Sequence, residues 1–194
     1  SFDWIMSLDH GFYSTIFGFY VFTGAFLSGI AAVTVLTILL SRRGIIPAPT
    51  DDQLHSLGKL LFAFATFWAY LWFCQYMLIY YANIPEEISY YLRRTTGGWE
   101  WLFWGNLIVG WLVPFVLLLR KRVKKSHSYV MGVALLILAT HWLDLYVMVI
   151  PATGATVLPS WTDIAFTLVF VPLALAVTIR TFKAHPPRPL KDPY

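Results

Sequence analysis

Five long apolar runs limit this chain to one kind of fold. They cover residues 14–40, 54–82, 101–119, 129–150 and 162–181. Each run is long enough to cross a bilayer as a helix, which takes about 20 mostly apolar residues. A membrane barrel would need shorter segments that alternate polar and apolar side chains, and none are visible. We therefore predict an all-α integral membrane protein in which five transmembrane helices form a bundle over residues 14–183.

The composition agrees with a membrane protein. Hydrophobic residues make up 58% of the chain and charged residues 12%, and the mean hydropathy is +0.65. A soluble domain usually contains about 25% charged residues. The net charge of +4 does not indicate nucleic-acid binding, because the basic residues gather in the connections between the apolar runs.

The position of the basic residues predicts the topology, since cytoplasmic loops carry an excess of Lys and Arg. The connections after the first, third and fifth runs are basic, whereas residues 1–13 and 151–161 contain no Lys or Arg. We predict that residues 1–13 form an outer-side segment and that residues 184–194 form a Pro-rich cytoplasmic tail. The chain starts at Ser1 without a signal peptide. We therefore expect it to be the C-terminal part of a longer polypeptide, with an odd number of spans before it.

The loop after the second run contains helix-start signals. Pro85 is followed by two glutamates, an order that is typical of the first turn of a helix. We predict a short surface helix here, with Tyr90 and Tyr91 at the membrane interface and Arg93 and Arg94 directed towards water.

Asp144 is the most informative polar residue of the apolar runs. A carboxylic acid at the centre of a membrane helix costs about 2.5 to 3.5 kcal/mol, so a buried ionisable residue indicates a functional site. His141 lies three residues earlier, on the same face of the predicted helix. The two groups could exchange a proton near neutral pH and form a relay station. The alternative is a polar pair that only fixes helix packing.

The second run places several polar residues on one helix face. At about 100° per residue, His55, Lys59 and Tyr70 fall close together along this face. Apolar residues interrupt it, so waters would have to bridge the gaps, and Gln75 lies off the face. His55 and Lys59 are one turn apart and could form a proton entrance. Alternatively, Lys59 extends along the helix to the cytoplasmic surface.

The residues argue against a redox centre in this chain. Cys74 is the single cysteine, so neither an iron–sulfur cluster nor an internal disulfide can form, and we expect it to be a small core residue. A b-type haem commonly takes two histidine ligands, and only His141 lies deep in a predicted span. No metal is predicted. Pro114 and Pro172 interrupt the third and fifth runs and predict local bends.

Several stretches together resemble one family. They are residues 2–9, 13–18, 54–62, 67–70, 75–76 and 81–87, and the resemblance extends to residues 141–144. The most specific are Asp-Trp-Ile-Met-Ser at 3–7 and Asn-Ile-Pro-Glu-Glu at 83–87, taken in combination. The chain is similar to the NrfD/polysulfide-reductase-like membrane subunits, and most closely to the ActF subunits of bacterial alternative complex III.

This resemblance implies the second half of a ten-helix subunit in a bacterial inner membrane. The implied complex belongs to a respiratory or photosynthetic chain and oxidises a quinol. Its iron–sulfur clusters, c-type haems and quinol would sit on partner subunits, with no cofactor in this chain. The resemblance also implies a proton pathway through buried polar groups, which would comprise His55, Lys59, Tyr70, Gln75, His141 and Asp144.

Three hypotheses therefore remain at the level of the sequence. The first is a non-redox subunit of a quinol:acceptor oxidoreductase that provides scaffold and a proton-translocation pathway. The second is a purely structural membrane anchor. The third is half of a secondary transporter, which a repeated five-span unit of opposite topology in the full-length sequence would favour.

Overall fold

The structure is a computed structural model that describes residues 1–184, and this part of the chain is helical without strands. Five helical segments are long and apolar enough to cross a membrane, namely Ile16–Arg42, Asp51–Ala82, Glu100–Leu119, His127–Thr153 and Trp161–Thr181. The predicted fold class is therefore confirmed. The predicted tail, apart from its first residue, lies outside the described residues.

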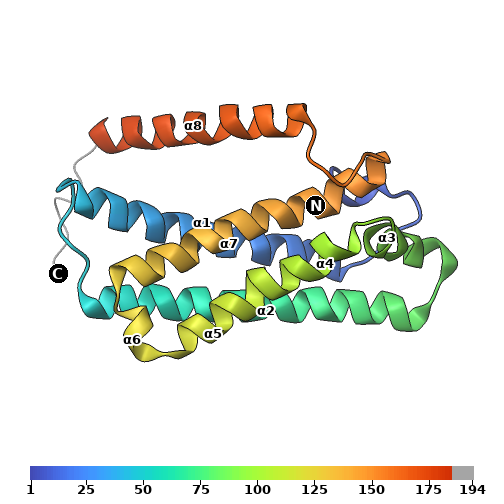
Figure 1. The fold of residues 1–194 in the computed structure, drawn as a ribbon, viewed down its shortest axis with the longest axis horizontal. Coiled ribbons are helices and arrows are strands. Elements are labelled where there is room, and N and C mark those ends of the chain that lie inside the picture. The colour runs from blue at the N-terminus through green and yellow to red at the C-terminus, as the bar shows by residue number, and fades with distance from the viewer. Residues whose placement is uncertain (185–194) are drawn as a thin grey trace.

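Four of the five spans pack into one bundle (Figure 1). Helix α1 (Ile16–Arg42) packs along both α2 (Asp51–Ala82) and α7 (His127–Val149). The third span consists of α4 (Glu100–Leu107), the π-helical segment η2 (Ile108–Leu112) and α5 (Val113–Leu119). It packs against α2 and α7. Aliphatic and aromatic side chains from these helices form one continuous core.

Short helices mark the two ends of this bundle. Helix α3 (Pro85–Thr95), η1 (Met6–Leu8) and η3 (Ile150–Thr153) lie at one end, and α6 (Lys121–Lys124) lies at the other (Figure 1). We refer to these as the α3 end and the α6 end. The topology predicted from the basic residues would place the α3 end outside.

Local sequence signals set the helix ends. Helix α2 starts with a capping box, in which Thr50 Oγ1 accepts from the Gln53 N–H at 3.3 Å and Gln53 Oε1 accepts from the Thr50 N–H at 3.0 Å. It ends at Asn83, whose φ of 50° is left-handed. Pro85 is then the first residue of α3, as predicted.

The third span changes its helical geometry where Pro114 was expected to disturb it. Proline has no N–H, and its ring clashes with the carbonyl four residues earlier in a regular helix. That carbonyl belongs to Gly110, which lies in the π-helical segment directly before α5. The wider π turn accommodates the proline while the helix continues across the membrane.

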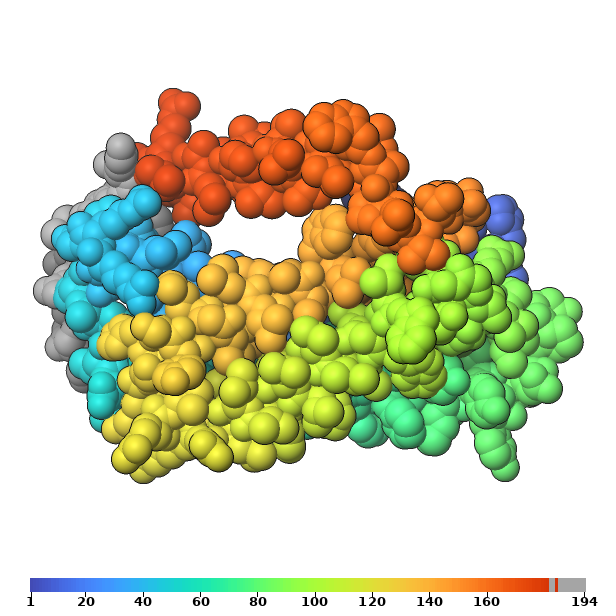
Figure 2. All heavy atoms as spheres, in the orientation of Figure 1, coloured from blue at the N-terminus to red at the C-terminus, as the bar shows by residue number. Residues whose placement is uncertain are grey.

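Helix α8 (Trp161–Ala184), which contains Pro172, stands apart from the other spans. None of its most apolar stretch is buried, and Figure 2 shows an opening between α8 and the bundle. One hydrogen bond across to it runs from Trp142 Nε1 to Thr167 Oγ1 at 3.1 Å. The bundle that positions the site described below therefore consists of the first four spans.

Candidate functional site

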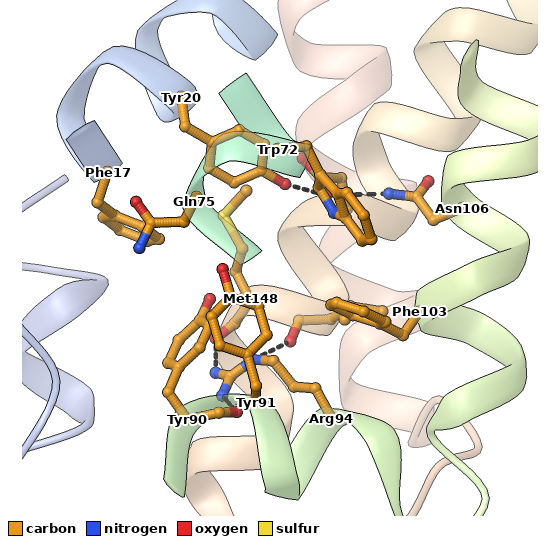
Figure 3. Close-up of a pocket in the computed structure, with 12 residues that line it drawn as sticks. Phe17, Tyr20, Trp72, Gln75, Tyr90, Tyr91, Arg94, Phe103, Asn106 and Met148 are labelled. Carbon is orange, nitrogen blue, oxygen red and sulfur yellow. Dashed lines mark hydrogen bonds between the residues drawn. The ribbon is translucent and has the colours of Figure 1, made fainter. Parts of the chain in front are cut away.

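The carboxyl group of Asp144 lies at the centre of a network that joins the four packed spans. Asp144, in α7, is 3% exposed. Its Oδ1 accepts from Tyr20 Oη of α1 at 2.5 Å and from Asn106 Nδ2 of α4 at 2.9 Å. Its Oδ2 accepts from Trp68 Nε1 of α2 at 3.3 Å. Figure 3 shows Tyr20 and Asn106 directed towards the same point from opposite sides.

These contacts suit an ionised carboxylate. A carboxylate only accepts hydrogen bonds, and all three partners of Asp144 are donors. Burial opposes the charge, whereas the three donors stabilise it. No Lys or Arg of residues 1–184 forms a salt bridge with Asp144. Proton uptake would remove a buried charge that no cation pairs with, at the expense of rearranged hydrogen bonds.

Arg94 is a second buried charge, at the α3 end. It is 1% exposed, so the prediction that it points to water is wrong. Its Nη1 donates to Asp9 Oδ2 at 3.2 Å and to the Tyr90 carbonyl at 2.6 Å. Its Nε and Nη2 donate to the carbonyls of Val147 and Met148 at 2.9 Å and 2.6 Å. Arg94 thus neutralises Asp9 and satisfies carbonyl groups at the end of α7.

Tyr90 and Tyr91 are also buried, at 5% and 7% exposure, so their predicted position at the interface is wrong. The Arg94 guanidinium carbon lies 3.4 Å from the centre of the Tyr90 ring, and Phe12 stacks against this ring. Burial raises the pKa of Tyr90 to about 12 and raises the pKa of Tyr91 well above its ordinary value. Both phenols therefore stay neutral at physiological pH.

A cavity lies between the Asp144 network and Arg94. Both residues line it, together with Gln75, Asn106 and Tyr91 (Figure 3). The space that water centres can occupy is about 20 Å³, and about 10 to 15 Å³ holds one water molecule. Two buried polar atoms of residues that line this cavity, Gln75 Nε2 and Asn106 Oδ1, have no hydrogen-bond partner among the described residues. We call this space the Asp144 cavity.

Among the described residues, no hydrogen bond joins His141 to Asp144. The imidazole instead packs against Gly24 of α1, where an added Cβ would lie 2.7 Å from His141 Cε1. His141 lines a second cavity together with Asn106 and Thr140, with about 10 Å³ of space for water centres. We call this the His141 cavity. Asn106 lines both cavities.

The remaining residues of the predicted pathway divide into two groups. Gln75 is 2% exposed, lines the Asp144 cavity and accepts a hydrogen bond from Ser14 Oγ at 2.7 Å. Lys59 is exposed, Tyr70 is 60% exposed and His55 is half-buried. The structure does not bring these three to Asp144. Lys59 and Tyr70 lie on the outside of the bundle, whereas the Nδ1 atom of His55 is buried without a hydrogen-bond partner among the described residues.

Sequence reasoning missed several partners of the buried charges. Tyr20, Trp68 and Asn106 contact Asp144, and Asp9 pairs with Arg94. Tyr and Trp are common near the ends of membrane helices, at the membrane interface. Their presence in a span therefore does not indicate that they donate to a buried acid. Asn106 had a signal, because it is the only amide side chain in the run 101–119. Cys74, expected in the core, is half-buried.

Comparison with known proteins gives one family match. The sequence model described as "Polysulphide reductase, NrfD" matches residues 1–157. This region contains Asp144, its three partners and both cavities, and it ends before α8. No curated protein matches the chain.

Proposed function

The chain belongs to the NrfD family of integral membrane subunits of redox complexes, and from this premise we propose that it is an ActF-like subunit of an alternative complex III that oxidises quinol. In this proposal quinol, iron–sulfur clusters and c-type haems bind to partner subunits. This chain holds no redox centre of its own and contributes membrane scaffold and a proton-translocation site.

The observation that carries the proton role is the setting of Asp144. Hydrogen bonds from three other spans hold one carboxyl group that is 3% exposed. Helix packing alone does not require a charge at this position, because a whole buried polar cluster can often be replaced by apolar side chains of similar size without loss of stability. A buried ionisable group in a membrane helix is characteristic of proton relays in pumps and transporters.

The described polar groups continue from Asp144 towards the α3 end. The Asp144 cavity leads to Arg94, which pairs with Asp9, and Asp9 also pairs with the half-exposed Arg93. We therefore propose that Asp144 exchanges protons with the side of the membrane at the α3 end. His55, Lys59 and Tyr70 would take part in a route from the α6 end if a partner subunit covers the exposed face of α2.

The test is the variant Asp144→Asn in the assembled complex. It keeps the size of the side chain but removes the group that binds the proton. We expect the ratio of protons translocated to electrons transferred to fall at least about a hundredfold, the lower end of the range of about 10² to 10⁴ that a positioned proton-transfer group contributes. The matched control is Asp52→Asn, the same chemical change at a side chain that is 95% exposed, which should translocate like the wild type.

The purely structural hypothesis predicts a different result. If Asp144 only packs helices, Asp144→Asn lowers the thermal stability of the complex and leaves the proton-to-electron ratio unchanged. Co-purification tests the complex itself, because iron–sulfur and c-haem subunits should accompany the chain from the membrane. Isolation without them would instead support the transporter hypothesis.

A further inference from the structure

The Asp144 and His141 cavities share one wall, which is the side chain of Asn106. Its Nδ2 donates to Asp144 Oδ1 at 2.9 Å. Its Oδ1 is buried and has no partner among the described residues. Asn106 is 2% exposed, and an acceptor left unpaired at such depth is destabilising. A water molecule bound in the cavity could donate a hydrogen bond to this acceptor.

We propose that each cavity binds a water molecule and that Asn106 is the positioning residue that governs proton exchange between His141 and Asp144. This inference rests on the proposed proton role of Asp144. The water in the His141 cavity donates to Asn106 Oδ1 and lies against the imidazole and Thr140. The water in the Asp144 cavity lies against the carboxylate and Gln75.

The local backbone supports a water site beside His141. Gly110 lines the same cavity, and an added Cβ there would lie 3.3 Å from Thr140 Oγ1 and 3.6 Å from Asn106 Oδ1. The absence of a side chain at Gly110 therefore keeps space next to the unpaired oxygen. Gly110 also belongs to the π-helical segment that begins two residues after Asn106, and π turns inside helices are frequent at functional sites.

The proposed transfer balances in atoms and charge. The N–H bond of a protonated His141 breaks and its proton passes to the water in the His141 cavity. That water releases a proton to the water in the Asp144 cavity, which protonates the carboxylate. Imidazole and carboxylic acid are left, both neutral, and the two waters are regenerated. Rotation of the Asn106 amide brings the two waters into contact, and in its resting orientation the amide separates them.

The first test is direct observation of the waters. A structure of the wild-type complex in its membrane environment, at a resolution that shows ordered solvent, should contain density within hydrogen-bond distance of Asn106 Oδ1. A His141 cavity that is filled by side chains or contains no density overturns the proposal, whatever the role of Asp144.

The second test compares three variants in the assembled complex. Asn106→Leu removes both ends of the amide and should lower the proton-to-electron ratio about tenfold, which corresponds to about 1.4 kcal/mol in the barrier to proton transfer. Asn106→Ser leaves room for an additional water and should keep at least half of the wild-type ratio. Thr34→Val, a buried polar change in α1 outside both cavities, should leave the ratio unchanged.

A purely structural role of Asn106 would alter stability in Asn106→Leu without lowering the ratio below that of Thr34→Val, and this result would overturn the inference. Asp144→Asn separates the two proposals. If Asp144→Asn abolishes translocation while Asn106→Leu translocates like the wild type, the proton role of Asp144 stands and the role of Asn106 fails. If Asp144→Asn translocates normally, the proposed function itself fails.

Discussion

The two ends of the bundle hold their acidic residues in opposite ways. At the α3 end, Asp9 is 4% exposed and pairs with Arg94, which is 1% exposed. At the α6 end, Lys125 lies 3.7 Å from Asp51 and 3.9 Å from Asp52, and these carboxylates are 68% and 95% exposed. A buried charge must have all its partners, whereas an exposed pair competes with water and salt. The comparison indicates that the charged groups at the α3 end contribute to the stability of the fold, whereas those at the α6 end contribute little.

The largest effect on stability should follow from Arg94→Met. The variant leaves Asp9 buried beside only one cation and removes the donors to two carbonyls of α7. Breaking a buried pair in this way costs about 3 to 5 kcal/mol. Thermal unfolding in detergent measures the loss. The matched control is Arg93→Met, which removes the half-exposed partner of the same carboxylate and should cost at most about 1 kcal/mol. Equal losses in the two variants would contradict the comparison.

A smaller effect is expected at Asp144 itself. Asp144→Leu leaves Tyr20, Trp68 and Asn106 without their acceptor. Each donor left unpaired costs about 1 to 3 kcal/mol, and removal of a buried charge that no cation pairs with offsets part of this cost. Asp144→Asn retains one acceptor oxygen and should be the more stable of the two variants. Denaturation in mixed micelles, followed by tryptophan fluorescence, gives the order. A Leu variant as stable as the wild type would show that the three donors find other partners.

Two glycines of α1 provide the next test. Gly24→Ala would place a Cβ 2.7 Å from His141 Cε1, and overpacking of this kind costs about 1 to 3 kcal/mol. Gly29→Ala is the control, because nothing lies within 4 Å of its added Cβ among the described residues. Alanine is favoured over glycine in a helix by up to about 1 kcal/mol, so the control should be neutral or stabilising. A destabilised Gly29→Ala complex would instead reveal a partner helix packed against α1 at Gly29.

The smallest effect should come from Lys125→Ala at the α6 end. The side chain pairs with two exposed carboxylates, and such pairs contribute between about 0 and 1 kcal/mol. The difference from the wild type should shrink further as salt is added, since exposed charges are screened. A loss comparable to that of Arg94→Met would mean that the α6 end is buried against another subunit.

The sequence predicted the number of membrane-spanning helices, because the length and hydropathy of a segment are enough to identify a span. It also predicted the start of α3 from Pro85 and the burial of Asp144 inside a span, since each depends on local sequence. The orientation of helix faces depends on packing between helices. Arg94 and Tyr70 illustrate this: the arginine, expected in water, is buried, and the tyrosine, expected on a polar route, is exposed.

The spacing of His141 and Asp144, three residues apart, likewise could not predict their hydrogen-bond partners. Spacing placed both residues on one face of α7 but could not show that Tyr20, Trp68 and Asn106 take all the hydrogen bonds to the carboxylate. Those donors come from other spans, up to 124 residues away along the chain. No local pattern contains that information.

Infrared difference spectroscopy of the complex during turnover tests the central claim most directly. A carboxyl group that gains a proton in a dry environment produces a carbonyl stretching band of a neutral acid. The account predicts that such a band arises and decays with each turnover in the wild type and in Asp52→Asn, and that it is missing in Asp144→Asn. If the wild type translocates protons and the band is absent, or if it persists in Asp144→Asn, Asp144 is not the group that carries the proton.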